Sequence, residues 1–311
     1  MGLTKQSIIT IAVLLFVVFS VFLIPKFKKN NHSQNPIQNL NAQAQAYILP
    51  VSQASYLPIR NFNIADPETD AKAAGIYDVR SERFLYTKNI NDKLPIASIT
   101  KLMTAIVIVE NLSLNDSFTA GAEDINVDGD GADLNKGEVI RGADLLKIML
   151  IKSSNDATLT FSSNAAKKKI NLVVKMNDKA KLIGMLNTKF NDPAGLEDSD
   201  SFSTVDDLVK LVRYVGKYPI IWDILLTQFA DVNSIDGRFS HRLVNTNQLL
   251  NQIPDIVGGK TGFTDGAMET MVLEVLVDSG RDQLISVILG SKNRFDETKK
   301  LIDWAKNAYQ W

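Results

Sequence analysis

The stretch GGKTGFTDGAMETMVLEVLVDSGRDQLISVILGSKN, residues 258–293, carries the pattern that decides the fold. It holds two apolar runs rich in Val, Leu and Ile, separated by a short polar segment with a glycine, and this pattern predicts strand, turn, strand. The next run, DETKKLIDWAKNAYQW, predicts a closing helix. The C-terminal end of the chain is therefore expected to supply neighbouring strands and a helix.

A second strand pattern lies far away in the sequence, in AAGIYDVRSERFLYTKN, residues 73–89. Its apolar positions predict two strands joined by a polar turn at Arg80 to Glu82. The patterns between these two regions predict helices from about Ser98 to Leu112, from Gly142 to Leu150 and on towards Asn164, and from Thr204 to Tyr218 with Ser203 as N-cap. Strands at both ends of a helical middle predict one α+β domain, with an antiparallel sheet built from both chain ends and flanked by helices.

The composition excludes several classes of function. The chain has 311 residues, 45% of them hydrophobic, and a formal net charge of -1, so it offers no basis for binding nucleic acid. It contains no cysteine and two histidines, His32 and His241. Disulfides, thiolate metal sites and cysteine nucleophiles are excluded, and a zinc or Ser-His-Asp hydrolase would need histidine chemistry that is scarce here. We expect no metal and no cofactor.

The N-terminal part divides into an apolar and a polar segment. Residues 8–24, IITIAVLLFVVFSVFLI, are nearly all apolar and, at ~1.5 Å per residue in a helix, stand at the short end of what spans a bilayer. We expect residues 1–29 to be a membrane anchor or a signal sequence, with an uncleaved anchor favoured, because no small-residue cleavage pattern comes directly after the apolar run. The composition of residues 30–70 predicts a flexible linker, and residues 71–311 are expected to form the folded domain.

The run PIASITKLMTA, residues 95–105, places a lysine in an otherwise apolar or small stretch. Ser98 and Lys101 are three residues apart at a helix start, so both side chains share one face. An apolar neighbourhood disfavours a charged amine, and a neutral amine can take a proton from serine. The alternative is a surface lysine one turn into a helix.

Two further short motifs are candidates for chemistry. Ser153-Ser154-Asn155 could relay a proton and bind a carbonyl, or could simply cap a helix. Lys260-Thr261-Gly262 offers a cation and a hydroxyl to a carboxylate, or could be a plain turn. A phosphate-binding loop is excluded, because that motif needs a glycine where Pro254 stands.

Together, S-x-x-K, S-x-N and K-T-G occur in the order found in serine enzymes that act on penicillin and on cell-wall peptides. From about Ala73 to the C-terminus the chain resembles the low-molecular-mass penicillin-binding proteins of the D-alanyl-D-alanine carboxypeptidase type, the S11 serine peptidases. The likeness also includes FNDPAGLEDSDSFSTVDDL and NTNQLL. The resemblance implies a β-lactamase/DD-peptidase-like fold with a mostly helical subdomain inserted.

The resemblance also implies roles for individual residues. Ser98 is expected to be the acylated nucleophile, Lys101 its base, and Ser153 a further catalytic group. The residues expected to bind substrate are Asn155, Lys260, Thr261, Gly262, Phe263 and Arg294. Among these, the Phe263 N–H would join that of Ser98 in an oxyanion hole. Arg294 would help to bind the terminal carboxylate, the alternative being a solvated surface arginine.

The implied activity is removal of the last D-alanine from peptidoglycan stem peptides, in cell-wall synthesis and shape, through an acyl-enzyme that β-lactams also form. The implied location is the outer side of the cytoplasmic membrane. Alternatives are a DD-endopeptidase, a non-catalytic peptidoglycan-binding or regulatory protein, and a β-lactamase, for which we find no E-x-x-L-N sequence between the second and third motifs. One departure stands beside the third motif: where relatives usually have A-G-x-x-L, this chain has Ala267-Met268-Glu269-Thr270-Met271.

Overall fold

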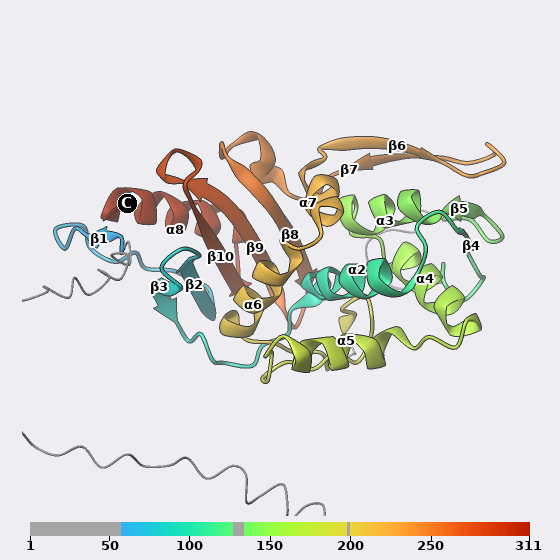
Figure 1. Ribbon diagram of the computed structural model, residues 1–311, viewed down its shortest axis with the longest axis horizontal. Helices are drawn as coiled ribbons and strands as arrows, with labels where there is room; N and C mark the ends of the chain where they lie inside the picture. The colour runs from blue at the N-terminus through green and yellow to red at the C-terminus, as the bar shows by residue number, and fades with distance from the viewer. Residues whose placement is uncertain (1–56, 127–133, 198–199) are drawn as a thin grey trace, which may run out of the picture. The chain divides into compact units, whose positions relative to one another are not determined.

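The fold is organised around a five-stranded antiparallel sheet in the order β3-β2-β10-β9-β8. The computed structural model describes residues 57–126, 134–197 and 200–311. The strands of this sheet are β2 (Ala73–Asp78), β3 (Arg83–Lys88), β8 (Ile256–Thr264), β9 (Met268–Val277) and β10 (Asp282–Ser291). Since β2 pairs with β10, the two distant strand regions of the sequence lie side by side, as predicted (Figure 1).

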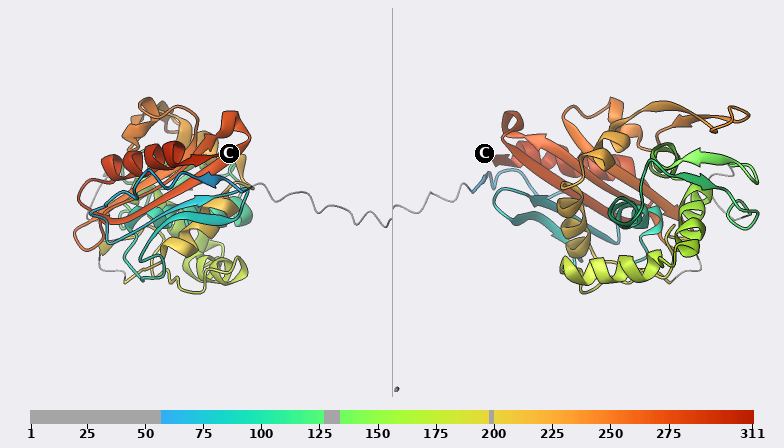
Figure 2. Two further views of the ribbon diagram at one scale, coloured as in Figure 1. Left: turned by 90° about the vertical axis from the view of Figure 1, so that its left-hand side faces the viewer. Right: turned by 45° about the vertical axis from the view of Figure 1, so that its right-hand side comes forward.

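Helices cover both faces of this sheet (Figures 1 and 2). On one face lies α8 (Arg294–Ala308), whose Leu301 and Ile302 pack with Leu273 and Ile288 of the strands. On the other face the sheet packs against the helical region. The remaining helices are α2 (Thr100–Asn111), α3 (Gly142–Ile151), α4 (Asn155–Lys167), α5 (Leu172–Leu182), α6 (Val205–Val215) and α7 (Pro219–Leu226). Apolar surface removed from water at both faces is the main force that holds these layers together.

Short elements complete the domain. The 3₁₀ helices whose residues are all described are η1 (Ala97–Ile99), η3 (Gln248–Asn251) and η4 (Asp278–Gly280). Two hairpins, β4 (Ser117–Thr119) with β5 (Val139–Arg141) and β6 (Phe229–Asn233) with β7 (Ser240–Val244), extend from the helical region. The β6–β7 hairpin is followed in the chain by η3 and then by β8, and so leads from the helical region back to the sheet.

The helix expected from Gly142 towards Asn164 is in fact two helices, because α3 ends at Ile151 and α4 begins at Asn155. Ser153 between them has a φ of +63°, a conformation that no α-helix can contain. The second motif therefore lies at a break and at the N-terminus of a new helix.

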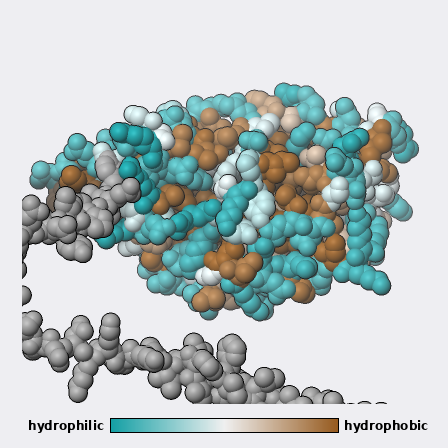
Figure 3. Space-filling view, viewed as in Figure 1, coloured by the Kyte–Doolittle hydropathy of each residue, from teal (hydrophilic) through white to brown (hydrophobic). Residues whose placement is uncertain are grey.

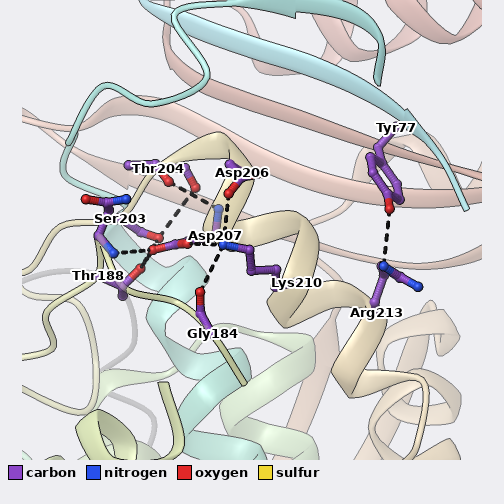
Figure 4. Close-up of polar contacts among 10 residues, drawn as sticks. Tyr77, Gly184, Thr188, Ser203, Thr204, Asp206, Asp207, Lys210 and Arg213 are labelled. Carbon is purple, nitrogen blue, oxygen red and sulfur yellow. Dashed lines mark hydrogen bonds and ion pairs between the residues drawn. The ribbon is translucent and has the colours of Figure 1, made fainter. Parts of the chain in front are cut away.

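The N-cap expected at Ser203 is instead Thr204, whose hydroxyl accepts from the Asp207 N–H at 3.1 Å (Figure 4). Ser203 contacts Thr188 Oγ1 at 2.7 Å. Asp207 is fully buried and accepts from Thr188 and from Lys210, so it ties the start of α6 to the preceding loop. A neutral side chain at 207 would leave that loop without its charge-assisted contacts.

The ordered domain begins earlier than the boundary at residue 70 that we predicted for the linker. Strand β1 (Ile59–Arg60) pairs with β11 (Tyr309–Gln310), and the Arg60 guanidinium lies 5.0 Å from the Trp304 ring centroid. The predicted segment 1–29, and the predicted linker up to residue 56, lie outside the described residues. Among the helices of the described part, none is long and apolar enough to cross a membrane. On the face seen in Figure 1, hydrophilic residues surround smaller apolar areas (Figure 3), as on ordinary globular proteins.

Candidate active site

Ser98 and Lys101 meet where η1 passes into α2. The Lys101 amine lies 2.7 Å from Ser98 Oγ, and the lysine is fully buried while the serine is half-buried. The preceding residue, Ala97, has a φ of +47°, which is uncommon for any residue with a Cβ. Backbone strain of this kind collects at functional sites, and here it lies directly before the serine.

Two further oxygen atoms surround the Lys101 amine. It donates to Asn155 Oδ1 and to the Ala194 carbonyl, both at 2.8 Å. An amide oxygen and a carbonyl oxygen can only accept, whereas the Ser98 hydroxyl can also donate. A neutral amine has two N–H groups for these two acceptors and a lone pair for the Ser98 proton. The site is therefore suited to an amine that acts as a base.

The break between α3 and α4 serves both purposes considered for the second motif. Ser154 is the N-cap of α4, with its hydroxyl 3.1 Å from the Ala157 N–H that it accepts from. Its neighbours on either side face the two buried lysines: Asn155 contacts Lys101, and Ser153 Oγ accepts from Lys260 Nζ at 2.7 Å. The helix cap and the candidate catalytic groups are thus different residues of one tripeptide.

The third motif lies on β8, against the serine. Lys260 is almost fully buried, and its amine also donates to the Thr261 carbonyl at 2.8 Å. A Cβ added at Gly262 would lie 3.0 Å from Ser98 N and 2.5 Å from Thr270 Oγ1. Only glycine therefore lets this strand run so close to the backbone of Ser98.

Of the last two predicted residues, Arg294 lies beside strand β8 and Phe263 lies on it. Arg294, the first residue of α8, donates through Nη1 to the Gly262 carbonyl at 3.0 Å. Phe263 directly follows Gly262 and pairs with Glu269 of β9, and the residue as a whole is 56% exposed. All nine predicted residues thus lie in or beside one connected arrangement, with Phe263 present through its backbone rather than its ring.

A model of the family described as D-alanyl-D-alanine carboxypeptidase, Peptidase S11, matches residues 60–293, which is well over half of the chain. The chain belongs to the Peptidase S11 family. This agrees with the resemblance seen in the three motifs, all of which fall inside the matched range.

Individual S11 relatives differ in the activity that their names give. The chain is 31% identical over 251 residues to "D-alanyl-D-alanine carboxypeptidase DacF" of Bacillus subtilis (strain 168), a match that covers 78% of this chain and 63% of that protein. It is 30% identical over 245 residues to a "D-alanyl-D-alanine endopeptidase" of Pseudomonas aeruginosa, covering 78% and 79%. The chain therefore spans less than two thirds of the length of DacF, and the names of these two relatives give different activities.

A solved structure gives the same fold. It is penicillin-binding protein D2 from Listeria monocytogenes in the ampicillin-bound form, with 28% identity and a TM-score of 0.67, covering 77% of this chain and 98% of that one. The β-lactamase/DD-peptidase-like α+β fold expected from the sequence is therefore confirmed.

Two groups that support this site, the Ala194 carbonyl and the Thr246 hydroxyl, had been given no role in the sequence analysis. The Ala194 carbonyl reaches Lys101 because Asp192 Oδ1 accepts from the N–H groups of Ala194 and Gly195, at 2.6 and 2.7 Å. A Cβ at Gly195, whose φ is +78°, would come within 2.0 Å of the Ala97 carbonyl oxygen. The signal was the DPAG sequence, which belonged to the likeness but had no assigned function.

Thr246 is the second contributor, from the NTNQLL stretch. Its hydroxyl lies 2.6 Å from the hydroxyl of Thr261. The bond orients a hydroxyl that was predicted to bind substrate, so Thr246 supports the site from behind the third motif.

A small cavity of about 70 Å³ is lined in part by Ala97, the residue before the serine, and by Glu197 and Thr264. The Glu197 carboxylate accepts from the Gly266 N–H at 2.7 Å and so joins the loop after Gly195 to the turn between β8 and β9. This contact forms one rim of the candidate active site.

Proposed function

We propose that the protein is a serine-type D-Ala-D-Ala carboxypeptidase that trims the terminal D-alanine from peptidoglycan stem peptides through an acyl-enzyme on Ser98. The observation that carries this proposal is the Lys101 amine, fully buried and 2.7 Å from Ser98 Oγ, with two pure acceptors, Asn155 Oδ1 and the Ala194 carbonyl, among its other contacts. A binding protein has no need of a base placed on a serine hydroxyl.

Acylation is the first half of the proposed reaction. Ser98 Oγ attacks the carbonyl carbon between the two D-alanines while its proton passes to Lys101. The developing oxyanion is held by the N–H groups of Ser98 and Phe263. The C–N bond then breaks, and the departing amine receives the proton held by Lys101, with the Ser153 hydroxyl as the relay. D-alanine leaves, and the remaining peptide is an ester of Ser98.

Deacylation reverses the proton movements. Water gives a proton to Lys101 as its oxygen bonds to the ester carbon, and the ester bond to Ser98 Oγ breaks as the serine regains its proton. During acylation, before D-alanine departs, Lys260, Thr261 and Arg294 hold its terminal carboxylate, since a lysine, a hydroxyl and an arginine are natural partners for that group. A β-lactam would acylate the same serine and leave slowly.

The second candidate activity is that of a DD-endopeptidase, because a relative with that name is 30% identical to this chain and a carboxypeptidase is 31% identical. Both activities use the same nucleophile and base. They differ in the group beyond the scissile bond, which is a free D-alanine in one case and a cross-linked residue in the other.

Residues 1–29 are proposed to anchor the protein in the cytoplasmic membrane, with the catalytic domain on its outer side. The support is the apolar stretch at residues 8–24 and the extracytoplasmic position of the proposed substrate. Fractionation of the full chain, together with protease treatment of intact cells, tests this part of the proposal.

The activity is tested by incubating the full chain with a labelled penicillin, a peptide ending in D-Ala-D-Ala, and a cross-linked dimeric stem peptide. We expect covalent labelling, release of D-alanine, and loss of both in Ser98→Ala. Labelling that persists in Ser98→Ala would overturn the nucleophile assignment. Cleavage of the dimer alone would identify an endopeptidase, labelling without any cleavage a binding protein, and rapid penicillin turnover a β-lactamase.

A further inference from the structure

Glu269 links the sheet to the first residue of α8. Its Oε2 accepts from the Arg294 N–H at 2.7 Å, and Arg294 is the first residue of that helix. A carboxylate at a helix N-terminus is favourable, because the first N–H groups have no partner within the helix. Glu269 therefore holds the backbone of Arg294 in place at the start of α8, shortly after the end of β10.

The same arginine is held at its other end by β8. Its Nη1 donates to the Gly262 carbonyl at 3.0 Å, and Gly262 follows Lys260 and Thr261. Glu269 lies opposite Phe263 across the β8–β9 pair, and opposite Ser291 on β10. Two adjacent strands thus hold one arginine, β9 at its backbone and β8 at its guanidinium.

The A-G-x-x-L pattern of relatives leaves position 269 unspecified, so the resemblance gives this residue no role. The preceding residue, Met268, has a φ of +56°, a conformation that glycine adopts more easily. The backbone thus turns sharply before Glu269, and this side chain reaches the start of α8.

We infer that Glu269 is a positioning residue, which sets Arg294 for contact with the terminal carboxylate of the substrate and thereby gives selectivity for a free C-terminus. The inference rests on the proposed function, and it concerns geometry rather than attraction, since the negative charge of Glu269 by itself opposes carboxylate binding. Arginine recognises a carboxylate through a planar fork, and this makes its contribution sensitive to small displacements.

The test compares a peptide ending in D-Ala-D-Ala with the same peptide whose C-terminal carboxylate has become an amide. The proteins are the full-length chain, Glu269→Ala, Glu269→Gln, Arg294→Ala and the Glu269→Ala/Arg294→Ala double variant. Glutamine keeps an oxygen that can accept from the Arg294 N–H, so it is the matched conservative variant. Thermal unfolding of each variant reports any loss of the helix cap separately.

For Glu269→Ala we expect kcat/KM for the free acid to fall about tenfold, mainly through KM, in line with a displaced charge-assisted contact. The value for the amide should stay within about twofold, and Glu269→Gln should behave like the unaltered protein. The double variant should be no worse than Arg294→Ala. A parallel loss on both substrates, or no change on either, would overturn the inference.

Failure of the proposed function has a different signature, because it affects the unaltered protein. If that protein binds peptide without cleaving it, the acid and amide peptides are compared by Kd, with the same expected loss of preference in Glu269→Ala. Penicillin labelling of the unaltered protein is recorded in parallel, so the two ideas stand or fall independently.

Discussion

Lys101 and Lys260 are both buried lysines in the same site, yet they face different partners. Lys101 is on a helix and its amine meets a half-buried serine hydroxyl, an amide oxygen and a loop carbonyl. Lys260 is on the strand β8, and its amine meets Ser153 and the carbonyl of its own neighbour. The difference teaches that burial alone does not assign a role. Each amine meets a serine hydroxyl and a backbone carbonyl, and the serine is what differs. Lys101 faces Ser98, the proposed nucleophile, and is expected to transfer its proton, whereas the family resemblance assigns Lys260 to the substrate carboxylate.

Of the substitutions that separate the two lysines, Lys101→Ala should have the largest effect on activity. Loss of a general base lowers the acylation rate by about 10²–10⁴-fold. The time course of labelling by penicillin measures it, with Lys167→Ala, an exposed lysine at the end of α4, as the matched control. The fold should persist, as circular dichroism can show. Near-normal labelling of Lys101→Ala would refute the role given to this lysine.

Glu274 extends the comparison to a buried acidic side chain, because burial is what shifts the pKa of its carboxyl group. It lies on β9 in the same sheet, and burial raises its pKa from 4.5 to about 7. Between those values the folded state binds more protons than the unfolded state, so stability is lost as pH rises from about 4.5 through 7. The loss is on the order of 3 kcal/mol.

Urea unfolding between pH 4.5 and pH 8 measures this effect for the unaltered protein and for Glu274→Gln. The glutamine variant should have a flatter profile and should be the more stable protein at the alkaline end. Equal slopes in the two proteins would show that Glu274 is not the titrating group.

Lys260→Ala tests the other half of the comparison. Removal of a charge-assisted contact to the substrate carboxylate costs about 1.5–3 kcal/mol, or about 10–150-fold in kcat/KM. The loss should appear mainly in KM for the free acid and should be small for the C-terminal amide. If the amide suffers equally, then Lys260 acts on the chemistry and not on the carboxylate.

The sequence predicted the sheet and the three motifs because these depend on local pattern. Alternating and continuous apolar runs mark strands, and the side chains of Ser98 and Lys101 meet across a single helical turn. The family match and the shared fold confirmed that architecture. The break at Ser153 was predicted only in part: the helix-cap alternative for Ser153-Ser154-Asn155 placed a helix end there, but no glycine or proline marks the positive φ of Ser153.

Contacts made by the backbone could not be predicted in the same way. The Ala194 carbonyl reaches Lys101 across 93 residues of sequence, and any residue type carries such an oxygen. Gly195, beside it, is the part of this contact that is visible in the sequence, since this residue must pass the Ala97 carbonyl without a Cβ. Likewise, the start of the ordered domain at β1 depends on a pairing with β11 at the other end of the chain.

Thr246→Val should have the smallest effect, and it tests whether the carboxylate-binding part of the site around Lys260 and Thr261 includes Thr246. The substitution keeps the shape of the side chain and removes a hydroxyl 2.6 Å from that of Thr261. Such a bond contributes about 0.5–1.5 kcal/mol, so kcat/KM for the free acid should fall about two- to tenfold. Thr227→Val is the matched control, because it removes a hydroxyl that donates to the Asp223 carbonyl at the end of α7. If both valine variants keep full activity, then Thr261 holds its orientation without Thr246, and the carboxylate-binding part of the site ends at β8.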